Sequence, residues 1–185
     1  MATKTLLTVP EYATLEEPEG VRYELSEGEL IVTPSPSLFH NDLRDELNGR
    51  LRAFAKRHNL GRVTSETDMK LVGEVVRRPD VAFIQSRRLQ DVDDDQSPLP
   101  VSPDLAVEIV SKSDRADDLL VKVSQYLDAG ARAVWLIYPN KRLAYRYVPG
   151  NPAPEVRTAE AGDRFEEPDL LPGLSLPLAE IFGQA

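Results

Sequence analysis

The sequence predicts an α/β (α+β) fold in which helices flank a mixed β-sheet. Two amphipathic segments of helical period, residues 38–58 and 114–129, lie before and after a central run of strand-like segments. Dense apolar runs at residues 105–110 and 133–138 are typical of strands in the interior of a sheet. Together these patterns favour an α/β sandwich over an all-helical or all-β domain.

The first part of the chain is expected to form a short helix and then an N-terminal β-hairpin. The short helix is placed at residues 9–15, and strand candidates follow at residues 22–25 and 29–32. Gly28, between the two strand candidates, supplies the glycine that a hairpin turn favours. Ser37 is well placed as the N-cap of the first long helix, residues 38–58.

The central segments are expected to be strands separated by turns and one long loop. Residues 62–71 alternate partly and predict a strand, and residues 75–76 lead into a second strand that is predicted at residues 79–85. Residues 89–102 predict a loop, because the stretch combines an acidic run with two prolines.

The second half is expected to continue with a strand, a helix and two further strands. Ser113 is a candidate cap for the helix at residues 114–129, and Gly130 is a good C-terminal stop. A strand at residues 143–148 and a loop with a short helix at residues 170–182 complete the chain. One domain is therefore expected over residues 1–185, with its core at about residues 20–150.

Composition restricts the kind of site that the chain can build. The 185 residues include no cysteine and two histidines, which excludes disulfides and thiolate zinc sites and disfavours a histidine-rich metal site. Any metal ion would be held mainly by carboxylates and carbonyls, which favours magnesium, manganese or calcium. The chain shows neither a signal-peptide pattern nor an apolar run of the ~20 residues that span a bilayer, so a cytoplasmic location without membrane contact is expected.

The net charge of −9 argues against strong non-specific binding to nucleic acid, but it leaves room for a local basic face. Basic residues gather in three places along the sequence: Arg50, Arg52, Lys56, Arg57 and Arg62; Arg77 and Arg78; and Arg87 and Arg88. A solvated surface is the usual explanation of such clusters, and it is the interpretation favoured here.

Two strand-like segments each carry one carboxylate among apolar neighbours. Asp80 stands near the start of one strand, and Glu108 lies within the apolar run at residues 105–110. A buried carboxylate is costly unless it is paired or binds a cation, so two of them on neighbouring strands would suit a hard metal ion. The carbonyl of Ile109 would supply a further oxygen ligand.

Simpler interpretations stay open for each of these residues. Pro79-Asp80 is also a common turn sequence, and a lone Glu108 also suits an edge strand that faces solvent. Lys122 borders the apolar stripe of its helix. It either pairs with Asp118, which is worth about 0.3 kcal/mol, or extends its charged end along the sheet. Asp104, in a second Pro-Asp pair, is interpreted as a residue that starts a strand.

The order and spacing of these motifs resemble the PD-(D/E)xK nucleases. Over about residues 8–182 they resemble, more specifically, the Uma-two family of restriction-endonuclease-like proteins. The matching segments are residues 23–25, 28–30, 34–36, 78–83, 104–111, 129–130, 134–136 and 171–177, with His40, Lys122 and Tyr126 as matching single residues. One departure is clear, because Val110 stands where the (D/E)xK lysine is expected. The resemblance implies that Lys122 replaces it, and Lys112 is the rival candidate.

The resemblance implies a restriction-endonuclease-like fold and a hydrolase that cleaves phosphodiester bonds in DNA. Asp80, Glu108 and the Ile109 carbonyl would hold Mg²⁺, or Mn²⁺ in its place. Lys122 would orient the attacking water or stabilise charge on the phosphate. Glu24 would hold a second ion or accept the proton of the water. His40 matches a family histidine, although it equally suits a satisfied histidine at a helix start.

Two functions are therefore weighed. One is a metal-dependent DNA endonuclease that acts as a homodimer, as members of the superfamily often do. The other is a catalytically inactive module of the same fold that serves nucleic-acid binding or protein assembly. The acidic balance and the displaced lysine favour the second function, whereas the set of Glu24, Asp80, Glu108 and Lys122 favours the first.

Overall fold

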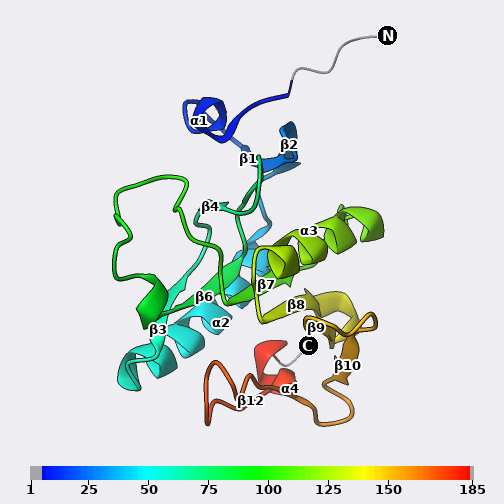
Figure 1. The fold of residues 1–185 in the computed structure, drawn as a ribbon. Helices are drawn as coiled ribbons and strands as arrows, with labels where there is room; N and C mark the ends of the chain where they lie inside the picture. Colours follow the sequence, from blue (N-terminus) through cyan, green and yellow to red (C-terminus); the bar gives the residue numbers. More distant parts are fainter. Residues whose placement is uncertain (1–5, 184–185) are drawn as a thin grey trace.

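A six-stranded mixed sheet forms the centre of the computed structural model, which describes residues 6–183 (Figure 1). Its strand order is β10-β9-β8-β7-β6-β3. The strands are β3 (Gly61–Thr64), β6 (Val81–Gln85), β7 (Leu105–Ile109), β8 (Ala133–Tyr138), β9 (Leu143–Tyr147) and β10 (Glu155–Thr158). Only β7 and β8 run parallel within this order, and the other neighbours are antiparallel. The predicted mixed sheet with flanking helices is confirmed.

Two long helices cover the two faces of this sheet. Helix α2 (Leu38–Arg57) packs Leu43, Leu47 and Leu51 against the face that carries Val107. Helix α3 (Ala116–Asp128) packs its own apolar stripe against the opposite face, which carries Ala106. Because side chains alternate along a strand, β7 directs Glu108 to the α3 side.

A smaller sheet, in the order β2-β1-β5-β4, stands beside the first (Figure 1). It contains β1 (Val21–Ser26), β2 (Glu29–Pro34), β4 (Met69–Lys70) and β5 (Val76–Arg77), and α1 (Val9–Tyr12) packs against it. The predicted hairpin of β1 and β2 is confirmed. Its two turn residues, Glu27 and Gly28, have φ of 50° and 82°, the conformation that a two-residue hairpin turn requires.

The strand predicted at residues 79–85 is confirmed as β6, and residues 76–77 before it form β5 in the smaller sheet. Two local predictions were wrong. Residues 62–71 form β3 and β4 in two different sheets, because the chain turns at Glu66, where φ is 54°. Ser113 does not cap α3, whose N-cap is Arg115; its hydroxyl lies 2.9 Å from that of Ser111.

The C-terminal segment completes the core on the α2 side. It contributes β11 (Arg164–Phe165), β12 (Leu176–Pro177) and α4 (Leu178–Ile181), and Phe165 lies 4.4 Å from the ring of Trp135. The short helix was predicted, whereas β10, β11 and β12 were not. The core therefore extends well beyond the predicted residues 20–150. Two 3-10 turns, Ser86–Arg88 and Pro139–Lys141, follow β6 and β8.

No helix within residues 6–183 combines the length and apolar character that crossing a bilayer would need.

Candidate active site

Strands β6 and β7 bring Asp80 and Glu108 to the same end of the main sheet. Val81 lies opposite Val107 in the antiparallel pairing, so the next positions along each strand are Asp80 and Glu108. The backbone N–H of Ile109 donates to Oδ2 of Asp80 at 2.6 Å. The two residues are only 8% and 6% exposed, so both carboxylates lie in a largely dry environment.

Helix α3 directs Lys122 into this group of carboxylates. Its Nζ atom lies 3.4 Å from Oε2 of Glu108 and 3.0 Å from Oε2 of Glu24. Lys122 therefore extends along the sheet face, as one of the two sequence interpretations has it, and not toward Asp118. The rival Lys112 is exposed in the turn after β7.

Glu24 enters from strand β1 and is held from three sides. Its Oε1 accepts hydrogen bonds from the Arg78 backbone N–H at 3.0 Å and from Lys122 at 3.1 Å, and its Oε2 accepts one from Arg77 at 3.0 Å. Arg77 also donates to Gln125 at 2.7 Å and to Ser26 at 3.0 Å. Both oxygens of Glu24 are thus already occupied by donors of this chain.

The interpretation of Arg77 and Arg78 as a solvated basic cluster was wrong. Arg77 is 3% exposed and pairs with Glu24. Arg78 forms ion pairs with Asp68 and Glu17. The local sequence gives no sign of this, because the partners of Arg77 lie 53 and 48 positions away.

Two further side chains complete the site. The hydroxyl of Tyr126 donates to Oε1 of Glu108 at 2.7 Å. Nε2 of His40 lies 3.0 Å from the carbonyl oxygen of Ile109 and 3.3 Å from Oδ2 of Asp80. Ser37 caps α2 by accepting the His40 N–H, which places the start of this helix at the site. His40 thus contacts two of the predicted metal donors.

The charges in the site are unevenly balanced. Burial, reinforced by the charges of Asp80 and Glu24 and opposed by Lys122, raises the pKa of Glu108 to about 7. Burial also acts to raise the pKa of Glu24, but Lys122 and Arg77 outweigh it and the net shift is downward. Burial opposes the protonated form of Lys122, yet Glu108 and Glu24 raise its pKa. Of these two carboxylates, Glu108 is therefore the one whose negative charge Lys122 and Arg77 compensate less.

The donor set fits a hard divalent cation. Asp80, Glu108 and the Ile109 carbonyl offer oxygen atoms, which Mg²⁺ and Mn²⁺ prefer. No group of three His, Asp or Glu side chains within residues 6–183 is arranged as a complete ligand set. Mg²⁺ commonly takes one or two carboxylates and completes its shell with water and substrate phosphate, so the two carboxylates suffice.

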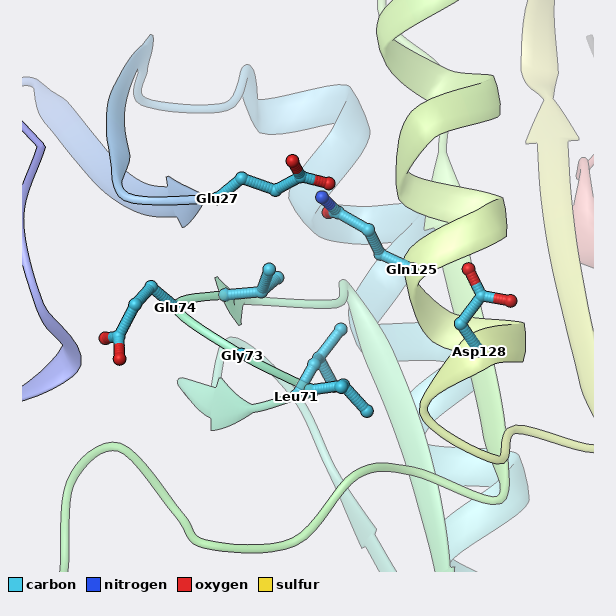
Figure 2. Close-up of a pocket in the computed structure, with 8 residues that line it drawn as sticks. Glu27, Leu71, Gly73, Glu74, Gln125 and Asp128 are labelled. Atoms are coloured by element: carbon cyan, nitrogen blue, oxygen red, sulfur yellow. The ribbon is translucent and has the colours of Figure 1, made fainter. Parts of the chain in front are cut away.

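A hollow of about 450 Å³ lies next to this network (Figure 2). Its lining includes Glu27, Leu71, Glu74, Gln125 and Asp128, and none of the predicted site residues. In Figure 2, Glu27 and Gln125 point toward one another at the hollow. Gln125 links the hollow to the site, because it also accepts the Arg77 hydrogen bond.

The comparisons with known proteins agree with the nuclease fold expected from the sequence. A family model, Uma2, described as "Putative restriction endonuclease", matches residues 9–179. One solved structure, described as a putative nuclease belonging to DUF820 from Anabaena variabilis, is similar with a TM-score of 0.84. The match covers 95% of this chain and 97% of that one at 22% identity, so it establishes the fold. No curated protein matches the chain.

Proposed function

Because the chain belongs to the Uma2 family of restriction-endonuclease-like proteins, we propose that it is an endonuclease that hydrolyses phosphodiester bonds in DNA with a divalent cation. The observation that supports this proposal is the placement of Asp80, Glu108 and Lys122 together at one end of the main sheet. Burying two carboxylates side by side costs stability, and a scaffold gains nothing from it. A site that recruits a cation explains the cost.

Asp80, Glu108 and the Ile109 carbonyl would hold Mg²⁺ or Mn²⁺. When bound, the ion would supply Lewis-acid polarisation of the scissile phosphate and a water of lowered pKa. Lys122 places a fixed positive charge beside Glu108, where it can stabilise negative charge that develops on the phosphate. Tyr126 holds the other Glu108 oxygen and so fixes the direction of this carboxylate.

Glu24 has a positioning role in this proposal. The sequence resemblance left it as a ligand of a second ion or as a proton acceptor. Its two oxygens instead accept hydrogen bonds from Lys122, Arg77 and the Arg78 backbone. Glu24 therefore anchors the Lys122 ammonium, and Arg77 in turn anchors Glu24. The proposed enzyme acts as a homodimer, in which each active site cleaves one strand of the duplex.

The test combines metal binding with DNA cleavage. Calorimetric titration with Mg²⁺ and Mn²⁺ should show binding to the wild type and its loss in Asp80→Asn. Asp104→Asn is a matched control, since Asp104 is also buried but accepts from the Gln85 N–H at the opposite end of β7. Wild-type protein should cleave plasmid DNA in Mg²⁺, and Glu108→Gln should not. Metal binding without cleavage on any DNA would instead support the inactive module of the same fold.

A further inference from the structure

The last turns of α2 carry three exposed cationic side chains, Arg52, Lys56 and Arg57. No carboxylate within residues 6–183 forms an ion pair with any of them. By contrast, Arg50 on the same helix pairs with Glu46 and Glu180. In a chain with a net charge of −9, three neighbouring cations without anionic partners form a local positive surface.

This positive surface borders a hollow of about 280 Å³ between α2 and β3, which we call the α2–β3 groove. Its lining is formed by Arg52, Lys56, Asn59, Gly61, Arg62 and Ser86, with Ala55 and Val63 at its apolar base. Strand β3 is an edge strand of the main sheet, so its outer backbone groups are also open to a ligand. Arg62 pairs with Asp94, so Arg52 and Lys56 supply the guanidinium and ammonium donors that remain without an ion pair among the described residues and that match the oxygens of a phosphate backbone.

Helix α2 links the groove to the candidate active site. It begins beside the Ile109 carbonyl, which His40 contacts, and it ends at the groove. At 1.5 Å per residue, Arg52 and Lys56 lie about 18 and 24 Å along the helix from His40. This distance corresponds to about 5 to 7 base pairs of a duplex. Asp45 lies on the same side of α2 as Arg52, and its charge is partly offset by Arg44.

We propose that the α2–β3 groove binds the phosphate backbone of a nucleic-acid duplex at a second point, about 5 to 7 base pairs from the bond that is cleaved. This inference rests on the proposed function, because it extends the substrate of the same site. A duplex of this length is stiff, so a duplex that runs along α2 from the active site would reach the groove without bending, whereas a flexible single strand would have to be ordered to do so. Although the protein as a whole is acidic, the α2–β3 groove gives it one place that attracts the phosphate backbone.

The test measures how salt weakens duplex binding in EDTA, by fluorescence anisotropy. The probes are a duplex of about 20 base pairs and a hairpin with a stem of about 4 base pairs, which is shorter than the distance between the two points. The double variant Arg52→Ala/Lys56→Ala should bind the long duplex about tenfold more weakly than the wild type. The magnitude of the slope of log K against log salt concentration should fall by about 2. Binding of the short hairpin should not change.

A charge-matched control separates the groove from a general charge effect. Arg157→Ala/Arg164→Ala removes the same charge from β10, at the opposite edge of the main sheet, and from β11. This pair should leave the slope unchanged. Equal effects of the two double variants, or an unchanged slope in the groove variant, would overturn the inference. If the groove variant weakened duplex binding but the wild type cleaved no DNA, the nuclease proposal would be contradicted and the assignment of the groove would still hold.

Discussion

The Nζ atom of Lys122 lies 3.0 Å from Oε2 of Glu24, a residue 98 positions earlier in the chain. The ammonium reaches the carboxylates from helix α3, whereas Val110, directly after β7, stands where the sequence resemblance placed a lysine. Glu24 holds this ammonium from the smaller sheet and so couples the β1–β2 hairpin to the site.

Glu24→Gln should destabilise the protein, because it leaves the buried cations Arg77 and Lys122 without their shared anion. We expect the free energy of unfolding to fall by about 3 kcal/mol, as when one partner of a buried ion pair is removed. Urea titration measures it. Glu17→Gln is the control, since Glu17 pairs with Arg78 nearer the surface and should cost less than about 1 kcal/mol. Equal losses in the two variants would show that Glu24 anchors nothing.

Lys122→Met should lower kcat about 100-fold, since a preorganised charge at the reacting phosphate is lost. Lys112→Met should have little effect. Adding Val110→Lys to Lys122→Met should recover about tenfold of the loss, because position 110 lies on the same side of the strand as Glu108. Steady-state cleavage kinetics measure all three. A large loss in Lys112→Met with none in Lys122→Met would assign the catalytic lysine to the turn after β7.

Stability in EDTA should depend on pH through Glu108. Its folded-state pKa of about 7 lies above the ordinary value of 4.5, so the folded state binds the proton more tightly than the unfolded state. The stability that this tighter proton binding contributes is fully present below pH 4.5 and is lost as the pH rises through about 7. The difference between the folded-state and the ordinary pKa of Glu108 corresponds to about 3 kcal/mol in the free energy of unfolding.

Glu108→Gln should remove this dependence, because glutamine stays neutral. Thermal melting in EDTA should therefore show the variant to be more stable than the wild type at pH 8 and similar to it at pH 4.5. Saturating Mg²⁺ should reverse the order at pH 8 by stabilising the wild type alone. A variant less stable than the wild type at pH 8 in EDTA would contradict the shifted pKa.

Local signals in the sequence were enough to place most of the elements. Gly28 marked the hairpin turn, Ser37 marked the start of α2, and the dense apolar run at residues 105–110 marked β7 as a strand in the interior of the sheet. The break between β3 and β4 escaped prediction because residues 62–71 alternate partly, as a strand does. The break at Glu66 separates two halves that join different sheets.

The residues of the site were harder to predict from the sequence than the fold was. Asp80 and Glu108 could be proposed from their apolar neighbours, whereas Glu24 entered only through the family resemblance. The burial of Arg77 had no local signal, since its partners Glu24 and Gln125 come from β1 and α3. Contacts between distant segments decide whether an arginine is a surface charge or a buried anchor.

Glu167→Ala should destabilise the fold without affecting the site. Glu167 is 2% exposed and accepts hydrogen bonds from Trp135 Nε1 at 2.5 Å and from Arg146 at 2.8 and 2.9 Å. Its removal leaves the buried Trp135 N–H without an acceptor and takes one of its two carboxylate partners from Arg146, which should cost about 3 kcal/mol. The fluorescence of Trp135, the single tryptophan, follows unfolding in urea. Mg²⁺ affinity at a temperature where the variant is folded should match the wild type, because Glu167 lies on the α2 side of the sheet, opposite Lys122 and Glu108. A parallel loss of metal affinity would show that the C-terminal segment also shapes the site.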